Sequence, residues 1–253
     1  MPSFIAVANQ KGGVGKTTTV VNLAAALALA GRKCLLVDLD PQGNATTGLG
    51  IDKSRHHGSH LLLADPKRVR ETIIRCEEHN LSIVPSSPTL PEAEAELAAV
   101  PDRMFRLKAA KAVLSELFDF VFVDCPPSVG FFPTNALTFC DSVIIPIQCE
   151  YYAMEGLTQI LSVIANIKRK LNPQLEMEGI LLTMCEPTAF GREVAGEVRN
   201  HFHSSVYRAR VPRDVALCES PSHGQSIIRY DPRSRGARAY VELAKEIISH
   251  EQR

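Results

Sequence analysis

The sequence has little that would staple the chain covalently or hold it in a membrane. It contains no tryptophan, and its seven cysteines include no C-x-x-C pair. Cys34, Cys125 and Cys140 adjoin apolar runs, so we expect buried thiols rather than zinc ligands, an iron–sulfur site or disulfides. No apolar run approaches the roughly 18 residues of a membrane-spanning helix. The first residues also lack a signal peptide's charged segment and cleavage site, so we expect a cytoplasmic protein without membrane contact.

The sequence also has no net charge, because 28 lysines and arginines balance 28 aspartates and glutamates. Whole-chain charge therefore gives no support for a constitutive nucleic-acid or membrane binder, and any site for a polyanion must be a local patch. Apolar residues make up 45% of the 253 residues, which excludes a disordered chain and allows a sizeable core. We expect residues 1–253 to form a single domain.

Short β-rich runs alternate with longer helical patterns along the chain. Several runs are apolar throughout, which is typical of parallel strands covered by helices on both faces. The sequence therefore predicts an α/β fold, a mostly parallel twisted β-sheet flanked by helices. The expected strands are Phe4–Ala8, Cys34–Leu39, Leu81–Val84, Phe120–Val123, Ser142–Ile147 and Gly179–Thr183.

Three helices can be placed from their ends or their periodicity. Lys16–Ala30 is rich in alanine and leucine and stops at Gly31, and residues 150–171 are closed by Asn172 and Pro173. From Ala237 onward a single apolar stripe predicts a docked helix with a mixed-charge outer face. Its members are Ala237, Tyr240, Val241, Ala244, Ile247 and Ile248. Between Asp52 and Pro101 we expect loops and short helices.

A glycine-rich loop lies between the first strand and the first helix. It fits the phosphate-binding pattern G-x-x-x-x-G-K-[ST] only if Gln10 replaces the first glycine. The lysine near its start, Lys11, marks the deviant Walker A subclass. Backbone N–H groups and the helix N-terminus would face phosphate, Lys16 would contact the β- and γ-phosphates, and Thr17 would ligate Mg²⁺. The expected nucleotide-binding residues are Lys11, Gly12, Gly13, Val14, Gly15, Lys16, Thr17 and Thr18.

Aspartates close two further strands. Asp38 and Asp40 follow one apolar strand and Asp124 ends another, and ligands bind at the carboxyl ends of strands in open α/β sheets. Asp124 is the expected Walker B acid, acting on magnesium through a bound water. Thr17, Asp40 and Asp124 form the expected magnesium site. Asp38 remains an alternative for ordering the magnesium shell or the loop.

Several longer motifs lie outside generic P-loop chemistry. These motifs are EYYAMEGL, the stretch around Val206 to Gly224, and YDPRSRGA. They accompany the three nucleotide-site motifs KGGVGKTTT, DLDPQGNATTGLG and DCPPS. In this combination, which spans nearly the whole chain, the sequence resembles the ParA/Soj family of chromosome and plasmid partitioning ATPases. The resemblance implies that the protein hydrolyses ATP to ADP and phosphate, with Lys11, Lys16 and Asp40 as catalytic residues and Asp40 orienting the attacking water.

The resemblance also implies an ATP-dependent homodimer. Lys11 of each protomer would reach the nucleotide of the other, with Gly13 at the crowded seam, while Met184, Pro212 and Arg213 would border the adenine. Because the motifs offer no arginine finger, we expect slow hydrolysis that a ParB/Spo0J-like partner accelerates.

The last implied property is binding of the ATP dimer to nonspecific DNA, which would place it on the nucleoid. Nine arginines face five acids between Arg192 and Arg238. Two arginines that the family offers to DNA are missing, because Glu186–Phe190 and Ala216–Glu219 depart from its D-x-R-T-N-L and R-L-S-E patterns. The expected replacements are Arg192, Arg199, Arg208 and Arg235, with a solvated face of intrachain salt bridges as the alternative.

Two other functions use the same ATPase core. A MinD-like regulator would need a membrane-binding C-terminal helix. A membrane-surface helix normally has a lysine- or arginine-rich face, whereas the helix expected from Ala237 onward has a mixed-charge outer face. An orphan ParA-like protein would position a protein cargo, and its ATPase site would look the same.

Overall fold

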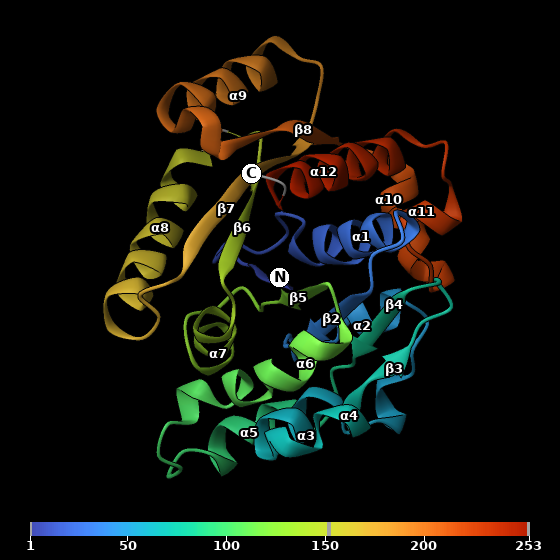
Figure 1. Ribbon diagram of the computed structural model, residues 1–253. Helices are drawn as coiled ribbons and strands as arrows, with labels where there is room; N and C mark the ends of the chain where they lie inside the picture. The colour runs from blue at the N-terminus through green and yellow to red at the C-terminus, as the bar shows by residue number, and fades with distance from the viewer. Residues whose placement is uncertain (1, 151–152, 252–253) are drawn as a thin grey trace.

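The computed structural model describes residues 2–150 and 153–251. Its centre is an eight-stranded sheet in the order β3-β4-β2-β5-β1-β6-β7-β8, parallel except where β3 pairs antiparallel with β4 (Figure 1). The strands are β1 (Ser3–Val7), β2 (Cys34–Asp38), β3 (Ile74–Arg75), β4 (Leu81–Val84), β5 (Phe120–Asp124), β6 (Ser142–Gln148), β7 (Glu176–Cys185) and β8 (Val206–Pro212).

Helices cover both faces of this sheet and enclose two hydrophobic cores. One core lies beneath α1 (Lys16–Leu29), α2 (Asn44–Gly48), α10 (Val215–Glu219), α11 (Ile227–Tyr230) and α12 (Arg235–Glu251). The other lies beneath the remaining helices on the opposite face (Figure 1). These are α3 (Gly58–Ala64), α4 (Val69–Thr72), α5 (Leu90–Glu96), α6 (Lys111–Leu117), α7 (Phe131–Phe139), α8 (Ala153–Lys170) and α9 (Ala189–Phe202).

All six predicted strands are present, with ends that differ by at most a few residues, and the α/β fold class is confirmed. Two strands were missed. The two-residue β3 is too short for a pattern, whereas β8 does alternate, since Arg208 and Arg210 are exposed between buried Tyr207, Ala209 and Val211. That period of two is typical of a strand with one covered face.

The predicted helices are also present. α1 ends at Leu29, and Gly31 has a φ of 88°, the left-handed conformation that lets glycine close a helix. α8 ends at Lys170, within one residue of the predicted end, while Tyr151 and Tyr152 of the EYYAMEGL motif lie outside the described residues.

The apolar stripe of α12 packs against α1 and β8. Ala237, Tyr240, Ala244 and Ile247 are buried as predicted, and Leu243 joins them. Val241 and Ile248 of the predicted stripe are half-buried against the same core, so most of the docked face is used inside the protein. Along the described residues, no helix is both long and apolar enough to cross a bilayer.

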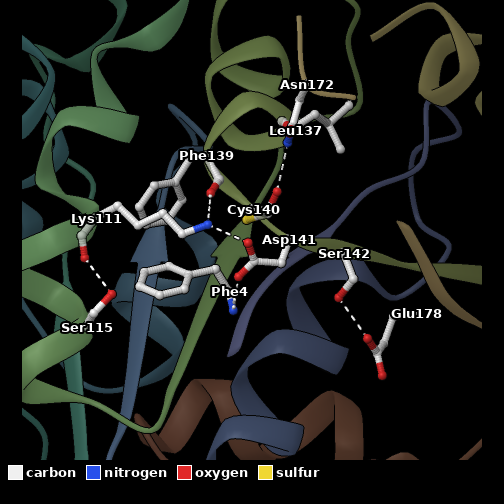
Figure 2. A network of polar contacts seen from close by, with 10 residues as sticks. All are labelled: Phe4, Lys111, Ser115, Leu137, Phe139, Cys140, Asp141, Ser142, Asn172 and Glu178. Atoms are coloured by element: carbon white, nitrogen blue, oxygen red, sulfur yellow. Dashed lines mark hydrogen bonds and ion pairs between the residues drawn. The ribbon is translucent and has the colours of Figure 1, made fainter. Parts of the chain in front are cut away.

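A polar network braces the sheet at the amino ends of β1 and β6, opposite the glycine loop (Figure 2). Lys111 donates to the Phe139 carbonyl at 3.0 Å and to Asp141 at 2.5 Å, and its ammonium lies 4.7 Å from the centre of the Phe4 ring. Asp141 accepts from the backbone N–H of Phe4. Lys111 thus ties α6 to both strands.

Candidate nucleotide site

The glycine loop connects the end of β1 to the start of α1, at the centre of the sheet. Gly13 and Gly15 have φ values of 74° and 87°, which side chains with a Cβ rarely adopt. Thr183 at the end of β7 donates its hydroxyl to the Val14 carbonyl at 2.9 Å. The loop is therefore curled by its glycines and held by Thr183 of β7, two strands from β1, with the N-terminus of α1 free to face an anion.

Lys16 lies inside the loop and is only 6% exposed. Its ammonium donates to the Lys11 carbonyl at 3.1 Å. Burial lowers the pKa of Lys16, and the nearby negative charge of Asp124 partly opposes that shift. A buried ammonium next to a main-chain oxygen is positioned to bind a phosphate.

Thr17 and Asp124 meet where α1 starts and β5 ends. The Thr17 hydroxyl donates to Asp124 Oδ2 at 2.7 Å, whereas Oδ1 is buried without a hydrogen-bond partner among the described residues. Burial raises the pKa of Asp124 well above its usual value, and the charge of Asp38 adds to that shift. A hydroxyl and a carboxylate with an unused oxygen are hard ligands of the kind that Mg²⁺ prefers, so these residues fit the expected ion.

Asp38 and Asp40 have different surroundings although two positions separate them. Asp38 is fully buried and accepts hydrogen bonds from the N–H and hydroxyl of Thr46 and from the N–H of Asp40. Burial raises the pKa of Asp38 to about 6, against these hydrogen bonds. Both oxygens of Asp38 thus bind the loop that follows β2, which favours ordering of the loop over the magnesium shell for this residue.

Asp40 uses only one of its two carboxylate oxygens in hydrogen bonds among the described residues. Its Oδ1 accepts from the Gln42 N–H at 2.9 Å, and the other oxygen has no hydrogen-bond partner within the described ranges. The Ser86 hydroxyl donates to the Asp40 carbonyl at 2.8 Å and fixes the backbone. This arrangement can orient a water molecule beside the loop.

Lys11 lies at the rim of the loop rather than inside it. Its side chain is 40% exposed and forms an ion pair with Glu150 at 3.4 Å. A pair this exposed contributes little to stability, about 0–1 kcal/mol. Lys11 is therefore free to exchange Glu150 for a stronger anion.

The three residues expected near adenine come together at the ends of β7 and β8. Pro212 pairs with Cys185 across the two strands, and the Arg213 N–H contacts the Cys185 carbonyl at 3.4 Å. Arg213 forms a half-exposed ion pair with Glu186 at 2.9 Å. The structure thus groups these residues, while their contact with adenine stays a prediction.

Sequence reasoning missed Gln148, which connects that group to the glycine loop. Its side-chain N–H₂ donates to the Gly13 carbonyl at 3.1 Å and to the Met184 sulfur at 2.9 Å. A polar residue at the end of an apolar strand next to the P-loop strand was the available signal.

The arginines expected at DNA are exposed or half-buried on α9, on β8 and at the start of α12. Arg192, Arg199 and Arg235 donate to backbone carbonyls, and within the described residues none of these three or Arg208 forms an ion pair. Within the described residues these four arginines thus lack the salt bridges of that alternative, while a solvated face remains open and their contact with DNA stays a prediction.

The fold and site define the chain as a P-loop nucleotide-binding protein with a deviant Walker A loop. The family described as AAA domain matches residues 3–177. The sporulation initiation inhibitor protein Soj of Bacillus subtilis is 48% identical over 252 residues, which cover 99% of this chain and 100% of that protein. The chromosome partitioning protein ParA of Myxococcus xanthus is 47% identical, with 98% and 88% of the two chains covered.

Among solved structures, a cobyrinic acid a,c-diamide synthase from Mycobacterium smegmatis with bound ADP and magnesium matches with a TM-score of 0.87 and 37% identity. The match covers 100% of this chain and 96% of that one. The expectation of ATP and Mg²⁺ agrees with the ligands of that structure. The chain belongs to the ParA/Soj family of P-loop ATPases.

Proposed function

We propose that this protein is an ATP-driven, dimerising switch that partitions chromosomes or plasmids. The observation that carries the proposal is Lys16, a buried ammonium beside the Thr17–Asp124 pair with its unused oxygen. Such a pocket is built for a phosphate and its magnesium ion. The partitioning role is supported by the similarity to Soj and ParA proteins over nearly the full chain.

The residues of the loop divide the work of binding. Backbone N–H groups from Gly12 to Thr18 and the start of α1 bind phosphate oxygens, and Lys16 neutralises their charge. Thr17 and Asp124 hold magnesium, which when bound draws charge from the phosphates. Met184, Pro212 and Arg213 border the adenine.

Hydrolysis depends on Asp40, whose free oxygen orients the attacking water. The motifs offer no arginine finger, so the transition-state charge lacks a stabilising guanidinium. Turnover is therefore slow in the isolated protein, and a ParB-like partner accelerates it.

Dimerisation uses Lys11. In the monomer the exposed ammonium rests on Glu150, and in the dimer it moves to the phosphates of the other protomer's ATP. A triphosphate carries more charge than one carboxylate and lies in a water-poor seam, so the exchange favours the dimer only when ATP is present.

Size-exclusion chromatography with ATP tests the switch. Asp40→Ala should dimerise stably and release no phosphate, because binding is intact while the water is no longer oriented. Lys11→Ala should bind ATP and remain monomeric. Asp52→Ala, an exposed carboxylate that pairs with Arg55, is the control and should behave as the unaltered protein. A monomeric Asp40→Ala protein would refute the proposed role of Asp40.

An orphan positioning protein is the second candidate, because the segment that departs from the family pattern displays Phe190 with 48% of its surface exposed. An aromatic at that place suits a protein cargo better than a phosphate backbone. A MinD-like role is disfavoured, since α12 buries its apolar stripe against α1 and β8. Liposome co-sedimentation separates the MinD-like role from the other two.

A further inference from the structure

Two cysteines face each other beside the glycine loop. Cys149 directly follows β6 and Cys185 ends β7, and their sulfur atoms lie 2.9 Å apart. Both are free thiols; Cys149 is buried and Cys185 is half-buried. Since a disulfide bond is about 2.05 Å long, the two sulfurs are within roughly 0.9 Å of bonding distance.

The backbone around the pair already suits a cross-link. β6 and β7 are neighbouring parallel strands, and the Cys149 N–H donates to the Thr183 carbonyl at 3.2 Å. Gln148 lies opposite Thr183, so Cys185 is one residue beyond the position opposite Cys149. A strand spacing of about 4.8 Å and an offset of about 3.3 Å along the strand give roughly 5.8 Å between the Cα atoms, inside the range of about 4.4–6.8 Å for disulfide-bonded cysteines. Bond formation therefore needs a small side-chain movement rather than a rearrangement of the sheet.

We propose that a hydroperoxide converts Cys149 and Cys185 into a reversible intramolecular disulfide, and that this bond prevents the ATP-dependent dimer from forming. The second half rests on the proposed dimerising function, whereas the first half does not. In reducing compartments, disulfides that do form are usually transient and redox-sensing.

The chemistry assigns different roles to the two sulfurs. The hydrogen bond from Cys185 lowers the pKa of Cys149, burial opposes that shift, and Arg210 adds to it. The Cys149 thiol loses its proton, the thiolate attacks one oxygen of hydrogen peroxide, the O–O bond breaks, and the released hydroxide takes up that proton to form water. The Cys185 sulfur then attacks the Cys149 sulfenic acid, and its thiol proton leaves with the departing hydroxide as a second water. The two thiols lose two electrons and the peroxide gains them.

The effect of the disulfide on the dimer follows from the contacts made next to each cysteine. Glu150, next to Cys149, pairs with Lys11, and the Cys185 carbonyl accepts from the Arg213 N–H. Cross-linking would fix the main chain at the carboxyl ends of β6 and β7, next to Glu150 and to the Cys185–Arg213 contact. These segments beside the glycine loop could then no longer shift to accommodate the second protomer.

Peptide mapping tests the bond itself. The full-length protein is treated with hydrogen peroxide, alkylated and digested. We expect one cross-linked pair of peptides whose mass is lower by two hydrogen atoms than the sum of the two peptides. Dithiothreitol should convert this pair back to the separate peptides. Cys149→Ala and Cys185→Ser should each abolish it, while Cys218→Ser, an exposed cysteine elsewhere, should not. No cross-link, or only a cross-link between two chains, would overturn the proposal.

The dimer is measured on the same samples. Oxidation should remove the ATP-dependent dimer peak of the unaltered and Cys218→Ser proteins, dithiothreitol should restore it, and the Cys149→Ala and Cys185→Ser dimers should resist peroxide. A mapped disulfide with an unchanged dimer would overturn the regulatory half. Reduced protein that never dimerises with ATP would instead overturn the proposed function and leave the cross-link standing.

Discussion

At the residue scale, two lysines of one loop have opposite environments. Lys16 is buried against a main-chain oxygen, whereas Lys11, five positions earlier, is exposed beside Glu150. The difference follows from position, since Lys16 opens α1 and Lys11 lies on the outer curve of the loop. These environments match the proposed roles, in which Lys16 binds the nucleotide of its own chain and Lys11 that of the other protomer.

Lys16→Ala should lose nucleotide binding altogether. The substitution removes the side-chain cation buried in the loop, and phosphate would then enter a pocket containing the carboxylates of Asp40 and Asp124. Isothermal titration with ATP and Mg²⁺ measures the affinity, and we expect a loss of at least about 100-fold, from an ion pair of some 3 kcal/mol. Lys245→Ala, an exposed partner of Glu242, is the control. Unchanged affinity would contradict the assignment of Lys16.

Lys111→Met should destabilise the fold without touching the nucleotide site. It removes the hydrogen bond to the Phe139 carbonyl, the ion pair with Asp141 and the interaction with the Phe4 ring (Figure 2). We expect the free energy of unfolding to fall by about 1–2 kcal/mol, discounted because the pair is partly exposed. Urea denaturation measures it. The control is Lys168→Met, which removes a single exposed ion pair with Glu176. We expect it to lower the free energy of unfolding by less than about 0.5 kcal/mol.

At the element scale, the edge strand β8 depends on α12. Its pairing with β7 is irregular. The step from Ile180 to Leu182 on β7 is two residues, whereas the matching step from Val206 to Arg210 on β8 is four. The Glu246 carboxylate of α12 accepts from the N–H groups of Arg208 and Ala209 at 2.9 and 2.6 Å. The helix therefore satisfies backbone donors that the sheet leaves unpaired.

Glu246→Ala should loosen this edge. Leaving the buried Ala209 N–H unsatisfied costs about 1–3 kcal/mol, and an edge with free donors is prone to pair with other chains. Urea denaturation should show the loss, and light scattering on warming should show earlier aggregation. Glu246→Gln keeps one acceptor and should fall between. Glu242→Ala on the same helix is the control; if both alanine variants lose equal stability, Glu246 has no special role.

At the scale of the whole molecule, dimerisation would bring two copies of the arginine surface together. Arg192, Arg199, Arg208 and Arg235 are unpaired by acids in the described chain, so their charge is available to phosphates. Pairing two protomers doubles the number of arginines that can reach the duplex, and affinity should then depend steeply on salt.

Mobility shifts with nonspecific duplex test this surface. Asp40→Ala with ATP at low salt should shift the duplex, and adding Arg208→Ala and Arg235→Ala should weaken binding uniformly across sequences. The salt slope should fall by about 1 for each phosphate that the variant no longer neutralises. Adding Arg55→Ala, a distant exposed arginine, should change nothing. An intact ATP dimer that shifts no DNA would refute nucleoid binding and favour the orphan role.

The fold was largely readable because its signals are local. Continuous apolar strands, the glycine loop and Gly31 each act through their own backbone or burial, so six strands, α1 and α12 could be placed. β3 was missed because two residues carry no pattern. β8 was missed although Arg208 and Arg210 alternate with buried residues, because an alternation this short also fits a loop.

The sequence by itself determined the class of site: the P-loop, Asp40 and Asp124 follow from residue order, since parallel strands bring their carboxyl ends to one edge of the sheet. Only the tertiary structure decided which polar side chains already have a partner within the chain and which remain available to a ligand. Asp38 accepts a hydrogen bond from Thr46, Lys11 forms an ion pair with Glu150, and the Cys149 sulfur lies beside the Cys185 sulfur. These pairings join residues 8 to 139 positions apart, because hydrogen bonds and burial depend on distance in space, which the order of residues does not contain.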